Sequence, residues 1–290
     1  MGKKLNWIIE ADIEGFFDHI DHKWMMLCLS ERIKDPNFKK LIKKFLRAGV
    51  MTDGQYFSTK EGTPQGGNLS PILANIYLHY VLDLWFEKRV KQQVKGYTEL
   101  VRYADDFVIG VQHREEAEKI RRDLDARFRK FGLSLSKTKT KVIEFGRFAK
   151  ENQWRKGKIK PETFDFLGFT HYCTTTRDGR FMVKVKTSRK RMIRATSAMS
   201  SWLKTIRNKV DTKEIWKTLA LKLTGHYQYY GISGNIEGIK WYYHKTMQIT
   251  LKWMNRRSRK KSWNFEEFRK YLTENPLPIP KLQYAIYNTW

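Results

Sequence analysis

The first half of the chain alternates between short apolar runs and longer segments in which apolar residues recur every three or four positions. Residues 5–13, 100–103 and 107–111 are dominated by β-branched and aromatic side chains, which is typical of strands. Helical spacing predicts helices over residues 24–30 and 38–48, and a longer helix that begins at Ser70-Pro71 and runs through Leu78, Leu82 and Phe86. Asp53-Gly54 is expected to be the turn of a hairpin between these helices.

Further along, residues 114–185 predict one more helix and more strands. Ala117, Ile120, Leu124 and Phe128 recur at helical spacing, and Gly132 is expected to end that helix. A short strand is expected before residues 136–141, and a hairpin from residues 164–169 and 181–185 with Asp178-Gly179 as its turn. This order predicts an α+β fold, an antiparallel sheet backed by helices as in ferredoxin-like folds.

From residue 188 onward the apolar positions recur with a period of 3.6 residues only. Three stripes predict a three-helix bundle, and they consist of Met192, Ala195, Met199, Trp202 and Ile206; Ile215, Leu219, Leu223 and Tyr227; and Ile236, Ile239, Tyr243, Met247, Thr250 and Met254. We therefore predict two domains, residues 1–187 and residues 188–290. The stripes are expected to form the core of the bundle, not a cofactor site.

Charge narrows the class of partner. The 290 residues carry 57 Lys and Arg against 30 Asp and Glu, a formal net charge of +27, which predicts binding to a polyanion, with nucleic acid as the leading candidate. Residues 151–290 hold 29 of the basic and 10 of the acidic residues. The basic surface is therefore expected mainly in the C-terminal domain.

Neither a membrane nor a disulfide framework is expected. No apolar run approaches the roughly 20 residues that span a bilayer, and the N-terminus lacks a signal peptide, so the sequence predicts a soluble, cytoplasmic protein. Cys28 and Cys173 are too few and too isolated for disulfides or a structural zinc site and are expected to be core residues.

The most informative chemistry is a set of three acids at strand ends. Asp105 and Asp106 lie in the turn between two apolar strands, and Asp12 lies at the end of another. Three carboxylates that converge on one point repel one another unless divalent cations neutralise them, as in two-metal phosphoryl-transfer sites. Oxygen ligands of this kind favour Mg²⁺ over zinc.

A glycine-rich loop precedes the helix that begins at Ser70-Pro71. Residues 61–68 contain three glycines and one proline, and Ser70 is expected to cap the helix with Pro71 in its first turn. A bare backbone beside a helix N-terminus suits contact with a phosphate or a nucleotide. The alternative is an ordinary Gly-Pro turn.

Four ordered motifs closely resemble the palm motifs of group II intron reverse transcriptases. They are Asp12-Ile13-Glu14-Gly15-Phe16-Phe17-Asp18, Thr63-Pro64-Gln65-Gly66-Gly67-Asn68-Leu69-Ser70-Pro71, Tyr103-Ala104-Asp105-Asp106 and Phe166-Leu167-Gly168-Phe169. The segment from Gly225 to Ile232, which reads GHYQYYGI, resembles the signature of the helical thumb, or maturase X region, of bacterial intron-encoded proteins. The resemblance runs nearly end to end and implies a polymerase palm over residues 1–187 and a thumb over residues 188–290.

The resemblance also implies roles for individual residues. Asp12 and Asp105 would ligate two Mg²⁺ ions, the Ile13 carbonyl would assist one of them, and Asp106 would support the site. Phe17 stands at the family's sugar-gate position, where an aromatic ring favours deoxynucleotides, although core packing is the alternative for Phe16 and Phe17. Gln65, Gly66 and Asn68 would line the nucleotide pocket. Lys139 resembles the family's lysine near the triphosphate, a candidate proton donor to pyrophosphate, although Lys137 and Lys141 alternate with it.

Two basic runs flank the helical half and are expected to bind nucleic-acid phosphates: Arg189, Lys190, Arg191 and Arg194; and Arg256, Arg257, Arg259, Lys260 and Lys261. A single run of this kind is more often a solvated face. His226 is a candidate RNA contact, but a histidine in an aromatic-rich helical stripe is more often held by packing.

The leading hypothesis is an RNA-directed DNA polymerase that uses an RNA template, a DNA primer and dNTPs. Family members carry a fingers region before the strand that bears Asp12, so we expect the chain to work with a separate fingers-bearing chain, with a truncated copy or an engineered fragment as alternatives. Exposed apolar surface near the N-terminus follows from this expectation. The competing functions are a non-catalytic RNA-binding maturase that assists splicing and a domesticated polymerase in phage defence.

Overall fold

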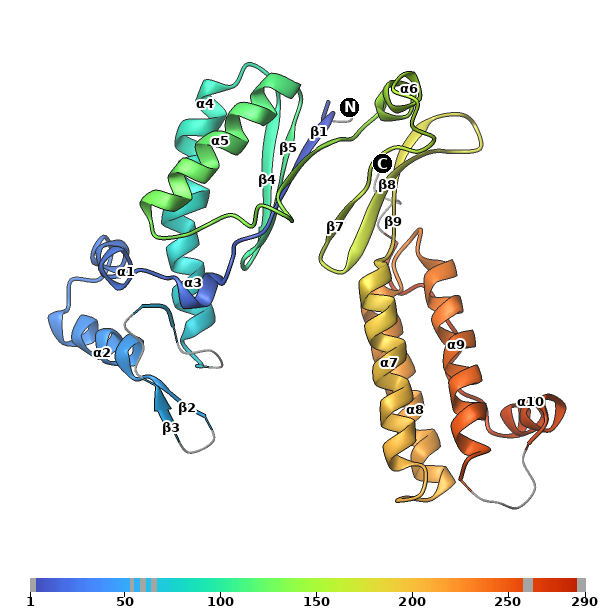
Figure 1. Cartoon of the computed structure of the whole chain (residues 1–290). Helices are drawn as coiled ribbons and strands as arrows, with labels where there is room; N and C mark the ends of the chain where they lie inside the picture. The colour runs from blue at the N-terminus through green and yellow to red at the C-terminus, as the bar shows by residue number, and fades with distance from the viewer. Residues whose placement is uncertain (1–3, 53–54, 58–60, 64–66, 258–262, 286–290) are drawn as a thin grey trace. The chain divides into compact units, whose positions relative to one another are not determined.

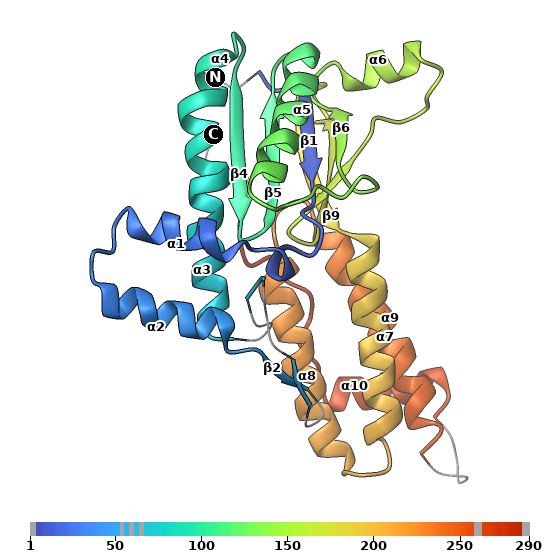
Figure 2. The ribbon, with the colours of Figure 1, turned by 60° about the vertical axis from the view of Figure 1, so that its left-hand side comes forward.

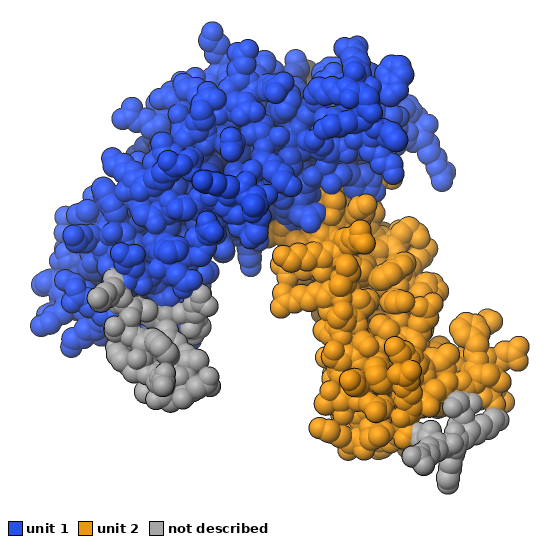
Figure 3. All heavy atoms as spheres, viewed as in Figure 1, with its two compact units in different colours: residues 1–166, 172–182 blue, residues 167–171, 183–290 orange. Residues whose placement is uncertain are grey.

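The computed structural model describes residues 4–52, 55–57, 61–63, 67–257 and 263–285, and these form two compact units (Figures 1 and 3). Unit 1 consists of residues 1–166 and 172–182, and unit 2 of residues 167–171 and 183–290. The assignment of palm and thumb domains to residues 1–187 and 188–290 stays a prediction.

Unit 1 is built around a four-stranded antiparallel sheet with the strand order β4-β5-β1-β6 (Figure 2). Its strands are β1 (Trp7–Ala11), β4 (Thr98–Tyr103), β5 (Asp106–Val111) and β6 (Lys141–Glu144). In the central pair Ile9 lies opposite Ile109 and Ala11 opposite Phe107. Because side chains alternate along a strand, these buried residues share one face, which packs into the core of unit 1.

Helices cover that face of the sheet. α5 (Arg114–Lys130) lies across β1, β5 and β6 with Ala117, Ile120, Leu124 and Phe128 buried, as the apolar stripe predicts (Figure 2). The predicted long helix is also confirmed. It begins as α3 (Ser70–Leu78), continues through two π-helical turns, η2 (His79–Asp83) and η3 (Phe86–Val90), and ends as α4 (Lys91–Gln93).

The remaining helices of unit 1 are α1 (His22–Ser30), α2 (Pro36–Arg47) and α6 (Ala149–Arg155). The first two lie at the predicted positions. Asp21 and Asp35 cap them, since each side chain accepts hydrogen bonds from backbone N–H groups of the first turn. Phe38, Leu41 and Phe45 of α2 are each nearly half exposed, which confirms exposed apolar surface near the N-terminus. β2 (Val50–Thr52) and β3 (Gln55–Phe57) form the predicted hairpin, whose turn residues Asp53 and Gly54 lie outside the described residues.

Two strand predictions were wrong in detail. The strand expected before residues 136–141 is reduced to a single bridge between Leu135 and Ile13, and the strand of that region, β6, comes after it. Residues 164–169 do not form one strand, because Leu167 and Gly168 take positive φ values of 49° and 79° and turn the chain. The result is a three-stranded sheet of β7 (Phe164–Phe166), β8 (Phe169–Thr175) and β9 (Phe181–Thr187).

Unit 2 contains the three predicted helices, α7 (Arg189–Ile206), α8 (Thr212–Tyr230) and α9 (Ile236–Met254). The apolar stripes form its core. The prediction missed a fourth helix, α10 (Phe265–Glu274), whose Phe268 is buried against Trp216. Asn264 and Glu267 form a capping box at its start, a pattern visible in the sequence as Asn-x-x-Glu.

Two smaller predictions have different outcomes. Cys28 is buried as expected, but Cys173 is only half buried, where its sulfur accepts a hydrogen bond from the Gly146 N–H at 3.2 Å. None of the helices in the described part of the chain is long and apolar enough to cross a membrane.

Candidate active site

The acidic turn joins β4 to β5 through only two residues. Tyr103 pairs with Asp106, so Asp106 is the first residue of β5, and Ala104 and Asp105 alone form the turn. Ala104 adopts a left-handed backbone with φ of 54°, which costs free energy in a residue with a Cβ. Other interactions must therefore hold this turn.

Arg102 supplies those interactions. Its Nη1 donates to the Ala104 carbonyl at 2.8 Å and to Asn75 Oδ1 at 2.9 Å, and its Nε donates to Asp83 Oδ1 at 2.7 Å. A second bond from Nη2 to Asp83 Oδ2 makes the pair bidentate. The arginine thereby fastens the acidic turn to the α3–η2 helix.

Strand register places Asp12 and Asp106 at the same end of the sheet. Ala11 lies opposite Phe107 in the antiparallel pair of β1 and β5, so the next residue of β1 and the preceding residue of β5 meet at one edge. Asp105 lies beside them in the turn. Within the described residues, however, no three His, Cys, Asp or Glu side chains are grouped so as to hold one metal ion.

Lys139 provides a cation at this edge. Its Nζ donates to Asp12 Oδ2 at 2.8 Å, and this bond together with the Asp12 charge raises the pKa of Lys139. Glu14 and Asp106 act in the same direction more weakly. The other two lysines lie elsewhere, since Lys137 lines a pocket beside α5 and Lys141 begins β6.

Phe16 and Phe17 lie on a 3₁₀ turn, η1 (Phe16–Asp18), and not on a strand end. Gly15 starts this turn with φ of 52°, which directs the chain away from β1. Phe16 is buried in the core, and Phe17 is partly buried and packs against it.

The start of the glycine-rich loop is docked on this 3₁₀ turn. The Thr63 N–H donates to the Phe17 carbonyl at 2.7 Å, and the Gly62 N–H donates to the Ile20 carbonyl at 2.9 Å. A Cβ on Gly62 would meet the carbonyl oxygens of Phe17 and Asp18 at 2.6 and 2.7 Å, so only glycine allows this approach. The sequence did not predict this contact.

The rest of the loop is only partly described. Gln65 and Gly66 lie outside the described residues, and Asn68 is exposed in the turn before α3. Ser70 was predicted to cap the helix, but it is the first residue of α3, and no side chain caps that end.

The predicted nucleic-acid contacts of unit 2 differ in their surroundings. Arg189, Lys190, Arg191 and Arg194 are exposed on the first turns of α7. Arg256 is exposed near the Trp253 ring, whereas Arg257 donates to Thr212 Oγ1 and the Val210 carbonyl, both at 2.9 Å. Arg257 thus joins the end of α9 to the start of α8, and Arg259, Lys260 and Lys261 lie outside the described residues.

His226 is held by packing, as the sequence favours. Its ring stacks on Tyr242 with the centroids 3.6 Å apart, and burial lowers its pKa to about 4. The imidazole is therefore neutral at pH 7.

Comparison with known proteins assigns the chain to a family. Residues 1–171 match the family model described as reverse transcriptase (RNA-dependent DNA polymerase), more than half of the chain. The chain belongs to the reverse transcriptase family.

Relatives include the group II intron-encoded protein LtrA of Lactococcus lactis subsp. cremoris, 35% identical over 176 residues that cover 53% of this chain and 29% of LtrA. The protein YkfC of Escherichia coli is 33% identical over 170 residues, which cover 48% of this chain and 44% of YkfC. The chain thus spans less than half the length of these relatives. The group II intron resemblance carried by the four motifs is confirmed.

The solved structure of apo telomerase from Candida tropicalis is similar with a TM-score of 0.51, at 16% identity over 92% of this chain and 44% of that chain. At this identity the likeness concerns the fold alone. It agrees with the predicted α+β class, an antiparallel sheet backed by helices.

Proposed function

We propose that this reverse transcriptase family member is an RNA-directed DNA polymerase of the group II intron type. The observation that carries the proposal is the edge of the sheet where Asp12, bound to Lys139, meets Asp106. Rigid strands hold the two carboxylates, and Arg102 fixes the turn that carries Asp105. A polymerase needs acids and a cation at one point on a rigid scaffold.

The donor atoms are of the type that magnesium prefers, although the described side chains are not grouped as a metal site in the absence of the ion. Carboxylate oxygens of Asp12, Asp105 and Asp106 and the carbonyl of Ile13 are the hard oxygen ligands that Mg²⁺ prefers, and Asp12 already holds a cation, the Lys139 ammonium. Two ions held by Asp12 and Asp105 would activate the primer 3′ hydroxyl and neutralise charge on the triphosphate and the leaving pyrophosphate.

The chain's own side chains would do the rest. The protonated Lys139 ammonium is bound to Asp12 at the candidate site. It would move from Asp12 to the phosphates and protonate the leaving pyrophosphate. The Phe17 ring would exclude a ribose 2′ hydroxyl by steric clash. The Thr63 N–H donates to the Phe17 carbonyl, which ties this residue to the start of the glycine-rich loop. Gln65, Gly66 and Asn68 of that loop would line the pocket for the dNTP.

Primer extension on an RNA template with Mg²⁺ and dNTPs tests the proposal. The assay uses this chain alone and with a fingers-bearing chain added, since the chain spans less than half of LtrA and of YkfC. Asp105→Asn should abolish synthesis, whereas Asp178→Asn, an exposed acid in the turn between β8 and β9, should not. Equal synthesis by both variants, or no synthesis by the unaltered chain in either arm, overturns the proposal.

A second candidate is a maturase that binds intron RNA without synthesis. The observation in its favour is the exposed basic start of α7, where Arg189, Lys190, Arg191 and Arg194 make no ion pair with any residue that the structure describes. Under this function, reversal of charge at Arg189 and Lys190 prevents RNA binding, and Asp105→Asn leaves assisted splicing of a group II intron unchanged.

A further inference from the structure

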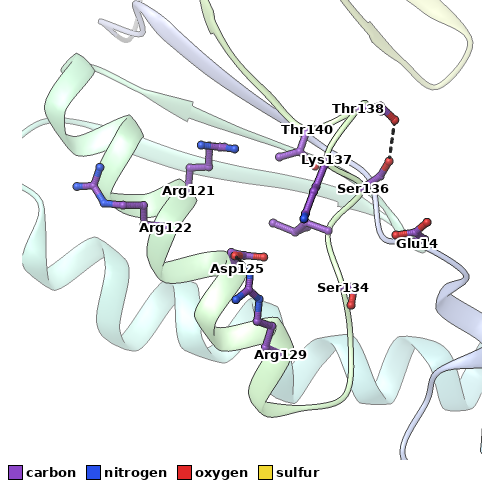
Figure 4. Close-up of a pocket in the computed structure, with 11 residues that line it drawn as sticks. Glu14, Arg121, Arg122, Asp125, Arg129, Ser134, Ser136, Lys137, Thr138 and Thr140 are labelled. Atoms are coloured by element: carbon purple, nitrogen blue, oxygen red, sulfur yellow. Dashed lines mark hydrogen bonds and ion pairs between the residues drawn. The ribbon is translucent and has the colours of Figure 1, made fainter.

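A pocket of ≈ 820 Å³ lies between α5 and the segment of residues 133–140, within unit 1 (Figure 4). Four basic side chains line it: Arg121, Arg122, Arg129 and Lys137. Four hydroxyl-bearing residues line it as well: Ser134, Ser136, Thr138 and Thr140. Cations combined with hydroxyl donors are the side chains that bind phosphate groups.

One of the hydroxyls lacks a partner. Thr140 is only 7% exposed, and its Oγ1 is buried without a hydrogen bond to any described atom. A buried hydroxyl without a partner costs free energy, so native proteins rarely keep one unless a ligand or water satisfies it. Thr140 is one of the residues that line the pocket, so an acceptor bound there would lie near this buried hydroxyl.

The cations of the pocket are not all neutralised by the protein. Arg129 is paired with Asp125 at 2.6 Å, but Arg121, Arg122 and Lys137 form no ion pair with another described residue. In Figure 4 Lys137 extends from the loop toward α5, whereas Arg122 points away from the loop. Because Arg129 is paired and Arg122 points away, Arg121 and Lys137 are the main sources of attraction for an anion. Glu14 also lines the pocket and repels an anion.

We infer that this pocket binds a phosphate group, held by Arg121, Lys137 and the Thr140 hydroxyl. The phosphate is carried by a strand of RNA or by a free polyphosphate, since both present the same oxygens. The site is distinct from the edge that holds Asp12, because neither Asp12 nor Lys139 lines the pocket.

The bound phosphate would also stiffen the segment that carries Lys139. The Ser136 N–H donates to the Asp12 carbonyl at 2.8 Å, and the Thr140 N–H donates to the Ser136 carbonyl at 2.9 Å. Ser136 and Thr140 therefore flank Lys139 with backbone bonds, while Lys137 and Thr140 line the pocket. A ligand on one side of this segment would hold the lysine on the other.

Binding to the full chain in EDTA tests the inference without polymerase activity, so its failure is separate from failure of the proposed function. The probes are a fluorescein-labelled 12-nucleotide single-stranded RNA and, separately, inorganic pyrophosphate. The pocket variant is Arg121→Gln with Lys137→Gln, and its control is Lys119→Gln with Lys130→Gln, which removes the same charge from exposed positions of α5 that do not line the pocket.

If RNA supplies the phosphate, the pocket variant binds RNA on the order of tenfold more weakly than the control, and its salt slope falls by about 0.7, the value for one phosphate of a single strand. If the ligand is a free polyphosphate, the unaltered chain binds pyrophosphate, the pocket variant does not, and RNA affinity matches the control. Equal behaviour of pocket variant and control toward both probes overturns the inference.

Thr140→Val tests the hydroxyl directly. Loss of an unpartnered hydroxyl should leave the Tm of the free protein unchanged or raised, while affinity for the active probe falls several-fold. Glu14→Gln should have the opposite sign and strengthen binding, because it removes a negative charge. Unchanged affinity with Thr140→Val, or weaker binding with Glu14→Gln, contradicts the assigned contacts.

Discussion

The Lys139 ammonium lies 2.8 Å from Asp12 Oδ2, so the acid at the end of β1 is already neutralised by a side chain of the same unit. Both groups are substantially exposed, with side-chain exposures of 64% for the lysine and 36% for the aspartate. An ion pair this accessible stabilises the protein by at most about 1 kcal/mol. Another cation can therefore replace the Lys139 ammonium on Asp12 at a small cost in free energy.

We expect Lys139→Met to strengthen Mg²⁺ binding by the free protein, because the metal no longer displaces the ammonium from Asp12. The gain is limited to about fivefold by the strength of an exposed pair. Titration with Mn²⁺, followed by electron paramagnetic resonance, measures it. Lys137→Met is the control, since that lysine lines the pocket beside α5. Weaker metal binding by Lys139→Met than by its control would mean that the lysine does not compete with the ion.

The positions of the acids could be predicted because the pattern around them is local. β-Branched and aromatic residues placed Asp12 at the end of one strand and Asp106 in the turn before another, and the antiparallel register then brought the two together. The choice of Lys139 over Lys137 and Lys141 came from the family resemblance alone, because no periodicity encodes the three-dimensional path of residues 133–140 that brings Lys139 to Asp12.

Arg102 was missed because its partners lie far away in the sequence. Asp83 and Asn75 belong to a different element, and only the fold brings them to β4. A signal was present nonetheless, since a lone arginine inside an apolar strand beside two acids requires a buried partner. The 3₁₀ turn at Phe17 was missed for a related reason, because a strand pattern cannot show that Gly15 takes a left-handed conformation.

Arg102→Ala should lower the free energy of unfolding by about 3 kcal/mol, because it removes the bidentate partner of the partly buried Asp83 carboxylate, which keeps only the His79 ring at 3.5 Å, and removes the bond that holds the strained turn at Ala104. In a chain active in primer extension, we also expect kcat to fall while the Kd for RNA stays the same. Urea unfolding and single-turnover kinetics measure the two effects.

The matched control for this substitution is Arg180→Ala. Arg180 also pairs with an aspartate, Asp178, but the two side chains are 80% and 71% exposed, so the loss should be below about 0.5 kcal/mol. Similar losses from both substitutions would show that the Arg102 network does not stabilise the acidic turn.

Gly62→Ala should displace the glycine-rich loop from the Phe17 turn, because the new Cβ would lie 2.6 Å from the Phe17 carbonyl oxygen. We expect a loss of about 2–4 kcal/mol in stability, and a higher KM for dNTP in a chain that synthesises DNA. Thermal unfolding and dNTP titration provide the two measurements.

Gly157→Ala separates backbone strain from this steric clash. Gly157 has a similar positive φ of 72°, but a Cβ there meets no atom within 4 Å. It should therefore lose only about 1 kcal/mol, the cost of a left-handed backbone. If Gly62→Ala were no worse than Gly157→Ala, the docking of the loop on Phe17 would be unimportant for stability.

Burial of His226 makes the helical bundle sensitive to acid. The histidine takes up a proton near pH 6.5 when unfolded but only near pH 4 when folded, because burial lowers its pKa to about 4. Between these values the unfolded state binds more protons, so the free energy of unfolding falls as the pH drops, by about 3 kcal/mol from this one group at pH 4.

His226→Phe keeps a ring to stack on Tyr242 and cannot be protonated. Denaturant unfolding at pH 7, 5 and 4, followed by tryptophan fluorescence, should show a shallower loss for this variant than for the unaltered chain. The exposed His244→Gln should lose stability as the unaltered chain does, and a parallel loss in all three proteins would show that His226 protonates as easily in the folded state as in the unfolded one.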